Sequence, residues 1–344
     1  MSKVNIKKEE YTKQDIVFLL KTDDQDIINE LYEYADKVKT EYMGNVVHIR
    51  AILEFSNNCC HNCLYCGIRK ANYKIKRYRI EPDEIIKYAI KADSLGFKTL
   101  ILQSGEDPYY TAEMIENIIR VIKNNTDLKL TLSIGERPES EYRKFKEAGA
   151  DRFLLKHETS DPVLYRQLHP DMKYSSRIKC LRDLKHLGFE TGSGIMVGLP
   201  GQTFESIAND ILFFEMMNID MIGIGPYIPH SDTPLERRFN EAGGYFAPAV
   251  GNFDVEELIY KVIAISRIVT RHTHIPATTG FNTLSDRDIR EKALKRGANV
   301  IMLNITDNEL REFYEIYPAK KELALKNTEK IEDLIKQYSD YQIV

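Results

Sequence analysis

The spacing of hydrophobic residues changes at about residue 46. Residues 12–42 carry apolar side chains at intervals of three and four, the pattern of amphipathic helix. From residue 46 short β-branched runs alternate with amphipathic stretches almost to the end of the chain. We therefore expect an N-terminal helical extension over residues 1–45, a larger α/β domain over residues 46–318 and a short helical tail over residues 319–344.

Eight apolar runs predict the strands of the larger domain. They lie at residues 46–55, 97–103, 128–135, 151–158, 189–199, 220–228, 274–280 and 298–304. The intervening stretches are helical in pattern, and Gly96, Gly149 and Gly188 follow three of them, as glycine often does where a helix ends. This alternation implies parallel strands joined by right-handed crossovers. Eight units predict a TIM-type (β/α)8 barrel; the alternative, a doubly wound open sheet, would be unusually wide.

Composition and charge exclude several classes of protein. The chain has 48 Lys and Arg against 52 Asp and Glu, a net charge of −4, so it lacks the basic excess of a dedicated nucleic-acid or anionic-membrane surface. The first fifteen residues have no apolar core of a secretory signal. The most apolar stretch, 210–225, is interrupted by Glu215, Asn218 and Asp220, so it does not predict a membrane span. We expect a cytoplasmic protein.

The cysteines carry the strongest chemical information in the sequence. Cys59, Cys63 and Cys66 have the spacing C-x3-C-x2-C on the loop that follows the first predicted strand. A structural zinc site usually needs four ligands, and no second cysteine pair follows. A 4Fe–4S cluster held by three thiolates leaves one iron open to an exogenous ligand. The motif predicts such a cluster; a zinc site completed by His61, or thiols without metal, are the alternatives.

Two further cysteines lie outside this spacing. Cys60 occupies a variable position of the motif, so the spacing favours a bystander over a substitute ligand. Cys180 lies in a helical pattern and is expected to be a small buried side chain rather than a ligand.

Polar residues follow the second and fourth predicted strands, at the rim where a barrel carries its chemistry. Gln103, Ser104, Gly105 and Glu106 end the second strand and could bind the ammonium of a methionine; an ordinary turn is the alternative. Glu158 ends the fourth strand and could accept hydrogen bonds from two ribose hydroxyls. Its alternative role is in the first turn of the next helix, where glutamate is favoured.

Other candidates are individually weaker. Lys156 alternates with the glutamate of the fourth strand and should point to the same face. Arg177 carries a guanidinium suited to a free carboxylate, although a lone arginine is more often solvated. Ile224 is expected to present an apolar edge for adenine, and Tyr227 and His230 are candidate substrate contacts, with core packing as the alternative.

Segments along the chain resemble one enzyme family in the same order. HIRAILEFSNNC, ILQSGEDPYY, TLSIGE, AGADRFLLKHET, GSGIMVGLPGQT, IGIGPYIPHSDTPL, IPATT and GANVIMLN together resemble the HydE family of FeFe-hydrogenase maturases, which are radical S-adenosylmethionine (SAM) enzymes. The resemblance runs from about residue 12 to 318 and is more specific than the cysteine motif. Biotin synthase and methylornithine synthase look similar at a greater distance.

The resemblance implies a complete barrel with a large cavity, one 4Fe–4S cluster and bound SAM. Reduction of the cluster would cleave SAM to methionine and a 5′-deoxyadenosyl radical. In HydE-like enzymes that radical is thought to attack an iron–cysteine–carbonyl–cyanide precursor delivered by the maturase HydG, and the product feeds assembly on HydF. The implied partners are therefore this small organometallic substrate, HydG, HydF and a reductant such as ferredoxin or flavodoxin.

The resemblance also implies roles for individual residues. By motif position Arg177 would bind the methionine carboxylate, Glu158 the ribose and Ser133 the neighbourhood of the sulfonium. The implied cofactor-binding set is Tyr65, Gln103, Ser104, Gly105, Ser133, Glu158, Arg177 and Ile224. The implied substrate cavity contains Thr131, Lys156, Tyr227, Thr278 and Thr279, with Gln103 beside them.

Three departures from the family pattern bear on cofactor and substrate. No cysteine follows Cys180, so a second cluster found in many relatives is not expected. Lys156 stands where the family generally has arginine, which keeps the charge but loses bidentate binding. Leu310 stands where an aromatic residue is expected. These changes keep open a same-scaffold enzyme with another substrate, such as an amino-acid mutase similar to methylornithine synthase; a non-enzymatic zinc scaffold is the third alternative.

Overall fold

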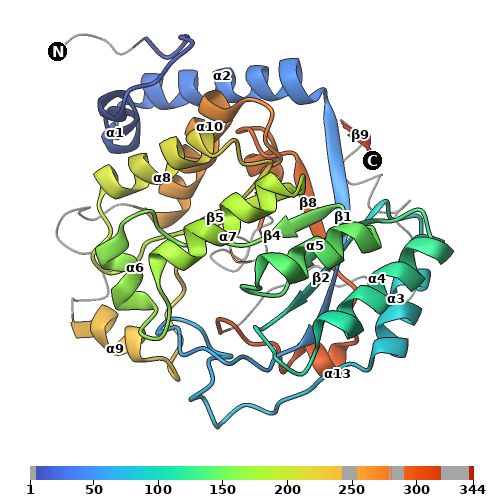
Figure 1. The fold of residues 1–344 in the computed structure, drawn as a ribbon. Coiled ribbons are helices and arrows are strands. Elements are labelled where there is room, and N and C mark those ends of the chain that lie inside the picture. The colour runs from blue at the N-terminus through green and yellow to red at the C-terminus, as the bar shows by residue number, and fades with distance from the viewer. Residues whose placement is uncertain (1–4, 242–253, 279, 281–289, 319–340) are drawn as a thin grey trace.

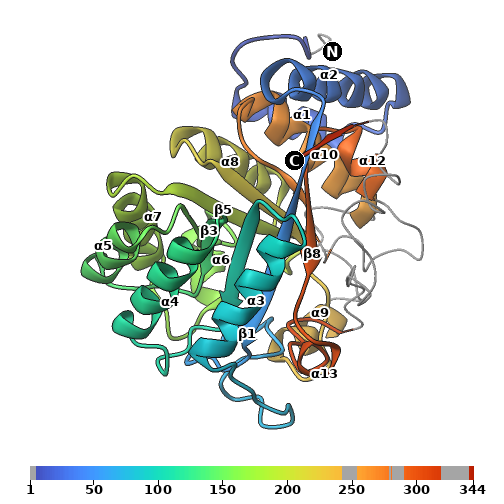
Figure 2. The same ribbon diagram turned by 90° about the vertical axis from the view of Figure 1, so that its right-hand side faces the viewer.

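The computed structural model describes residues 5–241, 254–278, 280, 290–318 and 341–344 (Figure 1). Parallel strands form the centre of the molecule, and helices cover their outer face (Figures 1 and 2). The strands are β1 (Val46–Ser56), β2 (Thr99–Ser104), β3 (Lys129–Ser133), β4 (Arg152–Leu154), β5 (Glu190–Val197), β6 (Met221–Pro226), β7 (Pro276–Ala277) and β8 (Val300–Asn304).

The strand order is that of a barrel. Neighbouring strands follow the order β6-β5-β4-β3-β2-β1-β8-β7, and every pair is parallel. A parallel bridge between Met221 and His274 joins β6 to the segment before β7, so the eight strands nearly close. The predicted (β/α)8 barrel is confirmed, and the open sheet is excluded.

Most helices begin and end where the sequence places caps. They are α1 (Lys13–Lys21), α2 (Gln25–Met43), α3 (Pro82–Ser94), α4 (Ala112–Asn125), α5 (Glu139–Ala148), α6 (Pro162–Leu168), α7 (Tyr174–His186), α8 (Phe204–Met216), α9 (Pro234–Glu241), α10 (Val255–Thr270), α12 (Arg290–Leu294) and α13 (Asn308–Arg311). Thr12 and Asp15 form a capping box at the start of α1. Gly149 ends α5 in the left-handed conformation, at φ 110°. None of the helices in these ranges is long and apolar enough to cross a membrane.

The structure corrects several element bounds. The helical pattern over residues 12–42 is two helices, because Asp24 caps a new helix by accepting the N–H groups of Asp26 and Ile27. The fourth strand ends at Leu154, earlier than predicted, and the seventh spans two residues. Residues 319–340, most of the expected helical tail, lie outside the described residues, while Gln342–Ile343 form β9 beside β1. The division into extension, barrel and tail stays a prediction.

Side chains alternate between the outside and the inside of the barrel. On β1, Ala51 and Leu53 pack into the main hydrophobic core under the helices. Ile52 and Glu54, between and after them, face the interior and line its cavity. Gly194 and Gly223 keep β5 and β6 close together there, because a Cβ at Gly194 would lie 2.2 Å from the Gly223 carbonyl oxygen. At these two positions the wall of the barrel interior therefore carries no side chains.

Two histidines lie inside the end of the barrel where the strands begin. The rings of His48 and His274 meet edge to face, 4.7 Å between centroids. Asn299 Nδ2 is 3.2 Å from His274 Nδ1 and donates to it, which requires the unprotonated nitrogen. Burial, reinforced by the charge of Arg50, lowers the pKa of His48 to about 4 and that of His274 to about 2. Both imidazoles are neutral in the folded protein at neutral pH.

This pair predicts a loss of stability in mild acid. The unfolded chain takes up protons below the ordinary histidine pKa of 6.5, whereas folded His274 stays neutral to about pH 2. Stability is thus complete above about pH 6.5 and falls as pH falls, by about 1 kcal/mol for His274 near pH 5.5. Anaerobic urea unfolding of the holoenzyme at both pH values measures it. His274→Gln should reduce the difference by about 1 kcal/mol, whereas His186→Gln, on an exposed side chain, should keep it; equal pH dependence in all three proteins contradicts the assignment.

Candidate active site

A cavity of about 370 Å³ opens at the carboxyl ends of the strands. This end of the barrel lies beside α9 and α13, opposite α1 and α2 (Figures 1 and 2). Most of the predicted site residues line it, namely Cys59, Cys63, Tyr65, Cys66, Gln103, Ser104, Gly105, Ser133, Lys156, Glu158, Arg177, Tyr227 and Thr278. The cavity brings together segments that are more than 200 residues apart in the sequence.

Three predicted residues, Ile224, Thr131 and His230, do not line this cavity. Ile224 is fully buried in the outer core, so its side chain does not line the cavity, and Gly225 beside it does. Thr131 is two residues before Ser133 on β3, so its side chain lies deeper in the interior, where Oγ1 is buried without a hydrogen-bond partner. Thr279 lies outside the described residues.

The three predicted cluster ligands belong to a loop of residues 57–78 that has neither helix nor strand. Asn57 anchors its beginning to its end. The Asn57 amide nitrogen donates to the carbonyl oxygens of Lys76 (2.8 Å) and Phe313 (2.7 Å), and its amide oxygen accepts the N–H of Tyr78 at 2.8 Å. One side chain therefore ties the loop to itself and to the segment after α13.

Arg77 holds the middle of the same loop. Its guanidinium donates to the backbone carbonyl oxygens of Ile68 (2.8 Å), Arg69 (2.7 Å) and Asn72 (3.1 Å), and also to that of Asn57. A guanidinium has five N–H donors in a fixed plane, so it can satisfy several carbonyls that no regular structure satisfies. These bonds give the loop a defined shape around the thiols.

The electrostatics of the thiols fit a metal cluster. Burial raises the pKa of Cys66 to about 12 and raises the pKa values of Cys59 and Cys63; neighbouring thiols reinforce the shifts of Cys63 and Cys66, and the Glu106 carboxylate reinforces that of Cys59. Three half-buried thiols around one cavity can be thiolates together only if a cationic group binds them. His61 is directed elsewhere, since its Nε2 lies 2.9 Å from Glu106 Oε1, which disfavours a zinc site completed by this histidine. The donor set fits a 4Fe–4S cluster with one open iron.

Tyr65, between two of the thiols, is fixed by His169. The carbonyl oxygen of Tyr165 accepts from His169 Nδ1 at 2.9 Å, so Nδ1 carries the proton and Nε2 accepts from the Tyr65 hydroxyl at 3.0 Å. Burial lowers the pKa of His169 to about 4, which keeps this neutral tautomer at neutral pH. Sequence reasoning missed this partner, because His169 lies 104 residues further along the chain.

Charged side chains pair across the cavity. Arg177, on α7, donates from Nε to Glu136 Oε1 at 2.7 Å and from Nη1 to the carbonyl oxygen of Lys156. The Lys156 ammonium lies 3.0 Å from Glu158 Oε2. Its methylene chain runs over Gly194, where an added Cβ would lie 2.8 Å from Lys156 Cε. The glycine-lined wall thus accommodates the extended lysine.

Glu158 has an unusual backbone. Its φ is 62°, a left-handed conformation that is uncommon for a side-chain-bearing residue. Its N–H donates to the Gly194 carbonyl oxygen at 2.9 Å, and its own carbonyl accepts the N–H of Met196 at 3.2 Å. The residue is therefore held on both sides by β5 although β4 has already ended. Such locally strained residues concentrate at functional sites.

A buried polar group lies directly behind Glu158. His157 Nδ1 donates to Ser193 Oγ at 2.8 Å, because that hydroxyl already donates to the Leu155 carbonyl oxygen at 3.0 Å. His157 Nε2 lies 3.7 Å from Asp210 Oδ1, and that oxygen also accepts the N–H of Ser160. Asp210, from α8, therefore holds the residues on both sides of Glu158.

Sequence reasoning missed part of the cavity wall. Glu54 and Asn304 meet inside the barrel, with Asn304 Nδ2 donating to Glu54 Oε2 at 2.9 Å. A glutamate within the apolar run of the first strand was the available sign. Leu310 packs against the main core and does not line the cavity, whereas Tyr314 and Tyr317 supply aromatic surface at this end.

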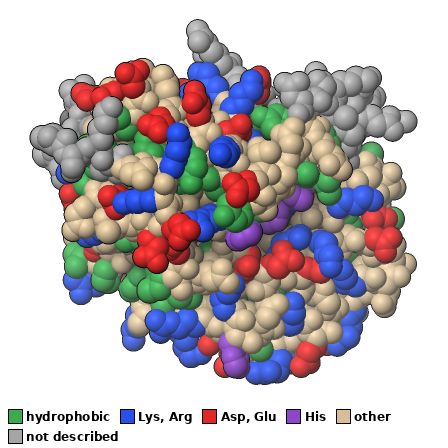
Figure 3. All heavy atoms as spheres, turned by 90° about the horizontal axis from the view of Figure 1, so that it is seen from above, with side chains coloured by type: hydrophobic (Ala, Val, Ile, Leu, Met, Phe, Trp, Pro, Cys, Tyr) green, Lys and Arg blue, Asp and Glu red, His purple; other side chains and the backbone are tan. Residues whose placement is uncertain are grey.

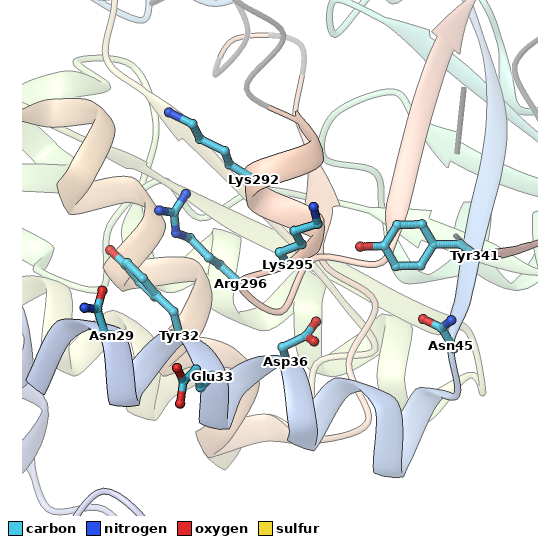
Figure 4. A pocket seen from close by; sticks show the side chains of 9 residues that line it. All are labelled: Asn29, Tyr32, Glu33, Asp36, Asn45, Lys292, Lys295, Arg296 and Tyr341. Atoms are coloured by element: carbon cyan, nitrogen blue, oxygen red, sulfur yellow. The ribbon is translucent and has the colours of Figure 1, made fainter. Parts of the chain in front are cut away.

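A second pocket, of about 540 Å³, lies on the surface between α2 and α12 (Figure 4). Glu33 and Asp36 of α2 face Lys292, Lys295 and Arg296 of the α12 region across it. It contains none of the predicted site residues. The surface over α1 and α2 shows lysine and arginine interspersed with aspartate and glutamate, rather than one basic patch (Figure 3).

Comparisons with known proteins indicate the same kind of active site as the residues of the cavity do. Residues 53–214 match the radical SAM superfamily. The chain is 46% identical over 315 residues to the [FeFe] hydrogenase maturase subunit HydE of Thermotoga maritima, covering 92% of this chain and 86% of that protein. It is 30% identical to 3-methylornithine synthase of Methanosarcina acetivorans, over 83% of this chain and 77% of that protein.

Solved structures show the same fold. Methylornithine synthase (PylB) superposes with a TM-score of 0.81 at 24% identity, over 98% of this chain and 96% of that one. The maturase HydG superposes with a TM-score of 0.76 at 21% identity, over 95% and 72%. A parallel barrel with three thiols on the loop after β1 defines a radical SAM enzyme, with a 4Fe–4S cluster and SAM as cofactors. Within that superfamily the chain belongs to the HydE family of FeFe-hydrogenase maturases.

The packing of the cluster loop against β2 gives a test. A Cβ at Gly105 would lie 2.2 Å from the Asn58 carbonyl oxygen and 2.9 Å from Cys59 Cβ, so Gly105→Ala must displace the first cluster ligand. We expect the variant, after anaerobic reconstitution, to retain less than about half of the iron and sulfide of the wild type. Gly225→Ala is the matched control, since its nearest contact would be at 3.6 Å. A full cluster in folded Gly105→Ala would contradict this packing.

Proposed function

We propose that the enzyme acts on an iron–cysteine–carbonyl–cyanide precursor in maturation of the FeFe-hydrogenase diiron cofactor. The observation that carries this proposal is the continuity of one cavity from the three thiols of the cluster loop to Lys156 and the aromatic wall of Tyr314 and Tyr317. Membership of the HydE family supports the same substrate class. When bound and reduced, the cluster supplies the electron that cleaves SAM to methionine and a 5′-deoxyadenosyl radical.

The residues around the thiols would bind SAM. Arg177 is proposed to bind the methionine carboxylate, with Glu136 orienting its guanidinium through the 2.7 Å hydrogen bond. Glu158 would accept hydrogen bonds from the ribose, and Ser133 lies on the neighbouring wall near the expected sulfonium. Tyr65 would contact the adenosyl part, fixed by its bond to His169. Ser104 and Gly105, at the end of β2, offer polar and backbone groups to the ammonium.

The deeper part of the cavity would hold the substrate. Lys156 supplies a positive charge for an anionic group, such as a carboxylate or a cyanide-bearing iron complex. Thr278 and Tyr227 line the same space, together with Gln103, and Thr131 offers an unpaired hydroxyl below it. Thr279 is proposed to join them. Because the strands surround this region, its residues exclude water from a reactive radical.

The proposed partners are those that the proposed maturation reaction requires. HydG would supply the iron precursor, HydF would receive the product, and ferredoxin or flavodoxin would supply the electron. These encounters place the enzyme in the cytoplasm. The balanced charge of −4 agrees with protein and small-molecule partners rather than nucleic acid or membrane.

The support behind Glu158 predicts an effect on SAM affinity. Asp210→Asn removes the charge that accepts the N–H of Ser160 and lies 3.7 Å from His157 Nε2, so Glu158 should lose its fixed direction. We expect SAM to dissociate roughly 5- to 30-fold more easily, equivalent to 1–2 kcal/mol, with cluster content unchanged. Titration of the holoenzyme with SAM, followed by calorimetry, measures this. Asp183→Asn, in an ion pair on the α7 surface, is the control; equal affinities in both variants would count against the role.

The radical chemistry has a direct test in the thiols. Cys63→Ser should abolish release of 5′-deoxyadenosine from SAM in the anaerobic, dithionite-reduced enzyme, because it removes a cluster ligand. Cys180→Ser should keep the activity, since Cys180 is buried in α7 away from the cavity. Cleavage by Cys63→Ser would disprove the cluster assignment.

The substrate assignment needs a second comparison. Deoxyadenosine, or its adduct, should rise strongly when the iron product of HydG is added to the reconstituted wild type. Slow cleavage that ignores this product, together with failure to activate hydrogenase in an assay complete in HydG and HydF, would favour an amino-acid mutase similar to methylornithine synthase. The 30% identity to 3-methylornithine synthase and the lysine at residue 156 make this the second candidate.

A further inference from the structure

A second group of metal-binding side chains lies at the edge of the cavity. Among the described residues, Cys60, His61 and Glu106 bring one thiol, one imidazole nitrogen and one carboxylate oxygen within 4.8 Å of one another. Two of these residues, His61 and Glu106, line the cavity, but Cys60 does not. Cys60 is therefore turned away from the space shared by the three cluster thiols. This placement disfavours Cys60 as a substitute cluster ligand and leaves its role unassigned.

The three side chains come from two segments that the backbone holds together. Cys60 donates its N–H to the carbonyl oxygen of Glu106 at 2.9 Å, so the cluster loop is registered on the segment after β2. Glu106 Oε2 accepts the N–H of Glu136 at 2.8 Å, which leaves Oε1 directed to His61 Nε2 at 2.9 Å. Ligand atoms bound to one metal at about 2.0–2.3 Å lie about 3–4 Å apart. The spacing of the group is close to that requirement.

His61 also has the outer support that metal-bound histidines usually have. Its second nitrogen, Nδ1, lies 3.4 Å from Asp171 Oδ2, while that same carboxylate oxygen accepts the N–H of Asn62 at 3.1 Å. A carboxylate on one ring nitrogen fixes the tautomer and directs the other nitrogen to a metal. If His61 and Glu106 formed only a surface ion pair, the thiol of Cys60 beside them would have no role in it.

We propose that Cys60, His61 and Glu106 form a binding site for one divalent transition-metal ion, distinct from the 4Fe–4S cluster, with Asp171 orienting the histidine. One sulfur, one nitrogen and one oxygen suit a borderline ion such as Zn²⁺ or Fe²⁺ rather than Mg²⁺ or Ca²⁺. Three protein ligands leave a coordination position for water or an exogenous ligand, the pattern of reactive rather than purely structural zinc sites. Two of the three ligands line the cavity, so a ligand on this metal could face the space inside the barrel.

Zinc binding to the intact holoenzyme tests the proposal. The reconstituted protein, with its cluster oxidised, is dialysed anaerobically against Zn²⁺, and zinc, iron and sulfide are measured per chain. We expect about one zinc ion per chain in the wild type and in the control Cys180→Ser. Cys60→Ser and His61→Gln should weaken zinc binding by more than about tenfold, and Asp171→Asn by about 10- to 100-fold, with iron and sulfide unchanged. Wild-type affinity in Cys60→Ser, or no zinc in the wild type, would overturn the site.

The ligand set can be measured independently of the cluster, because zinc and iron absorb X-rays at different edges. The zinc edge of the wild type should show one sulfur neighbour with nitrogen and oxygen, and Cys60→Ser should show none. Three sulfur neighbours, accompanied by loss of iron, would mean that zinc has replaced the cluster, and would refute the proposal. SAM cleavage by Cys60→Ser is measured in the same samples. Loss of the zinc site with cleavage retained distinguishes a failure of the zinc proposal from a failure of the proposed maturase function.

Discussion

Three half-buried thiols have to be held around one cavity by a loop that has no regular secondary structure, and the rest of the site depends on how that loop is fixed. Asn57 and Arg77 do this through backbone carbonyl oxygens rather than through side-chain packing. A buried carbonyl without a partner would destabilise the folded state by an amount comparable to a lost hydrogen bond. These hydrogen bonds therefore give the loop a defined shape and direct its thiols to one place.

The part of the cavity wall that follows β4 is held by main-chain pairing with β5 rather than by side-chain bonds to loop carbonyls. β4 ends at Leu154, and Glu158 still pairs with β5 through a left-handed backbone. His157 points into the buried polar group of Ser193 and Asp210, so its neighbour Glu158 points into the cavity beside Lys156. Of these two adjacent residues, His157 thus supports the wall from behind and Glu158 faces the cavity. The residue that the proposed mechanism assigns to the SAM ribose thus has a left-handed backbone, at φ 62°.

The sequence allowed the fold and the cluster ligands to be predicted because both depend on local patterns. Strand–helix alternation gives the barrel, and C-x3-C-x2-C gives the thiols. The alternation of side chains along a strand also predicted that Lys156 and Glu158 lie on the same face. The same rule was not applied to Ile224: because its neighbour Gly225 faces the cavity, Ile224 must face outward into the core. His169, Glu136 and Asp210 could not be predicted, because each acts through a partner that only tertiary packing brings near. The two-residue length of β7 likewise reflects packing rather than propensity.

The shortness of β7 has a consequence for how this barrel can adapt. β1 pairs with β2 and β8 over long ladders, and β5 with β6 over six residue pairs; within the described part of the chain, β7 pairs with β8 at two positions and meets the β6 side through one bridge. The circumference of the barrel can therefore change at this seam with the loss of few main-chain hydrogen bonds. A catalytic apparatus anchored on β1 to β5 would stay in register while the interior widened or narrowed beside β7. Such a seam lets one radical-generating half serve substrates of different bulk.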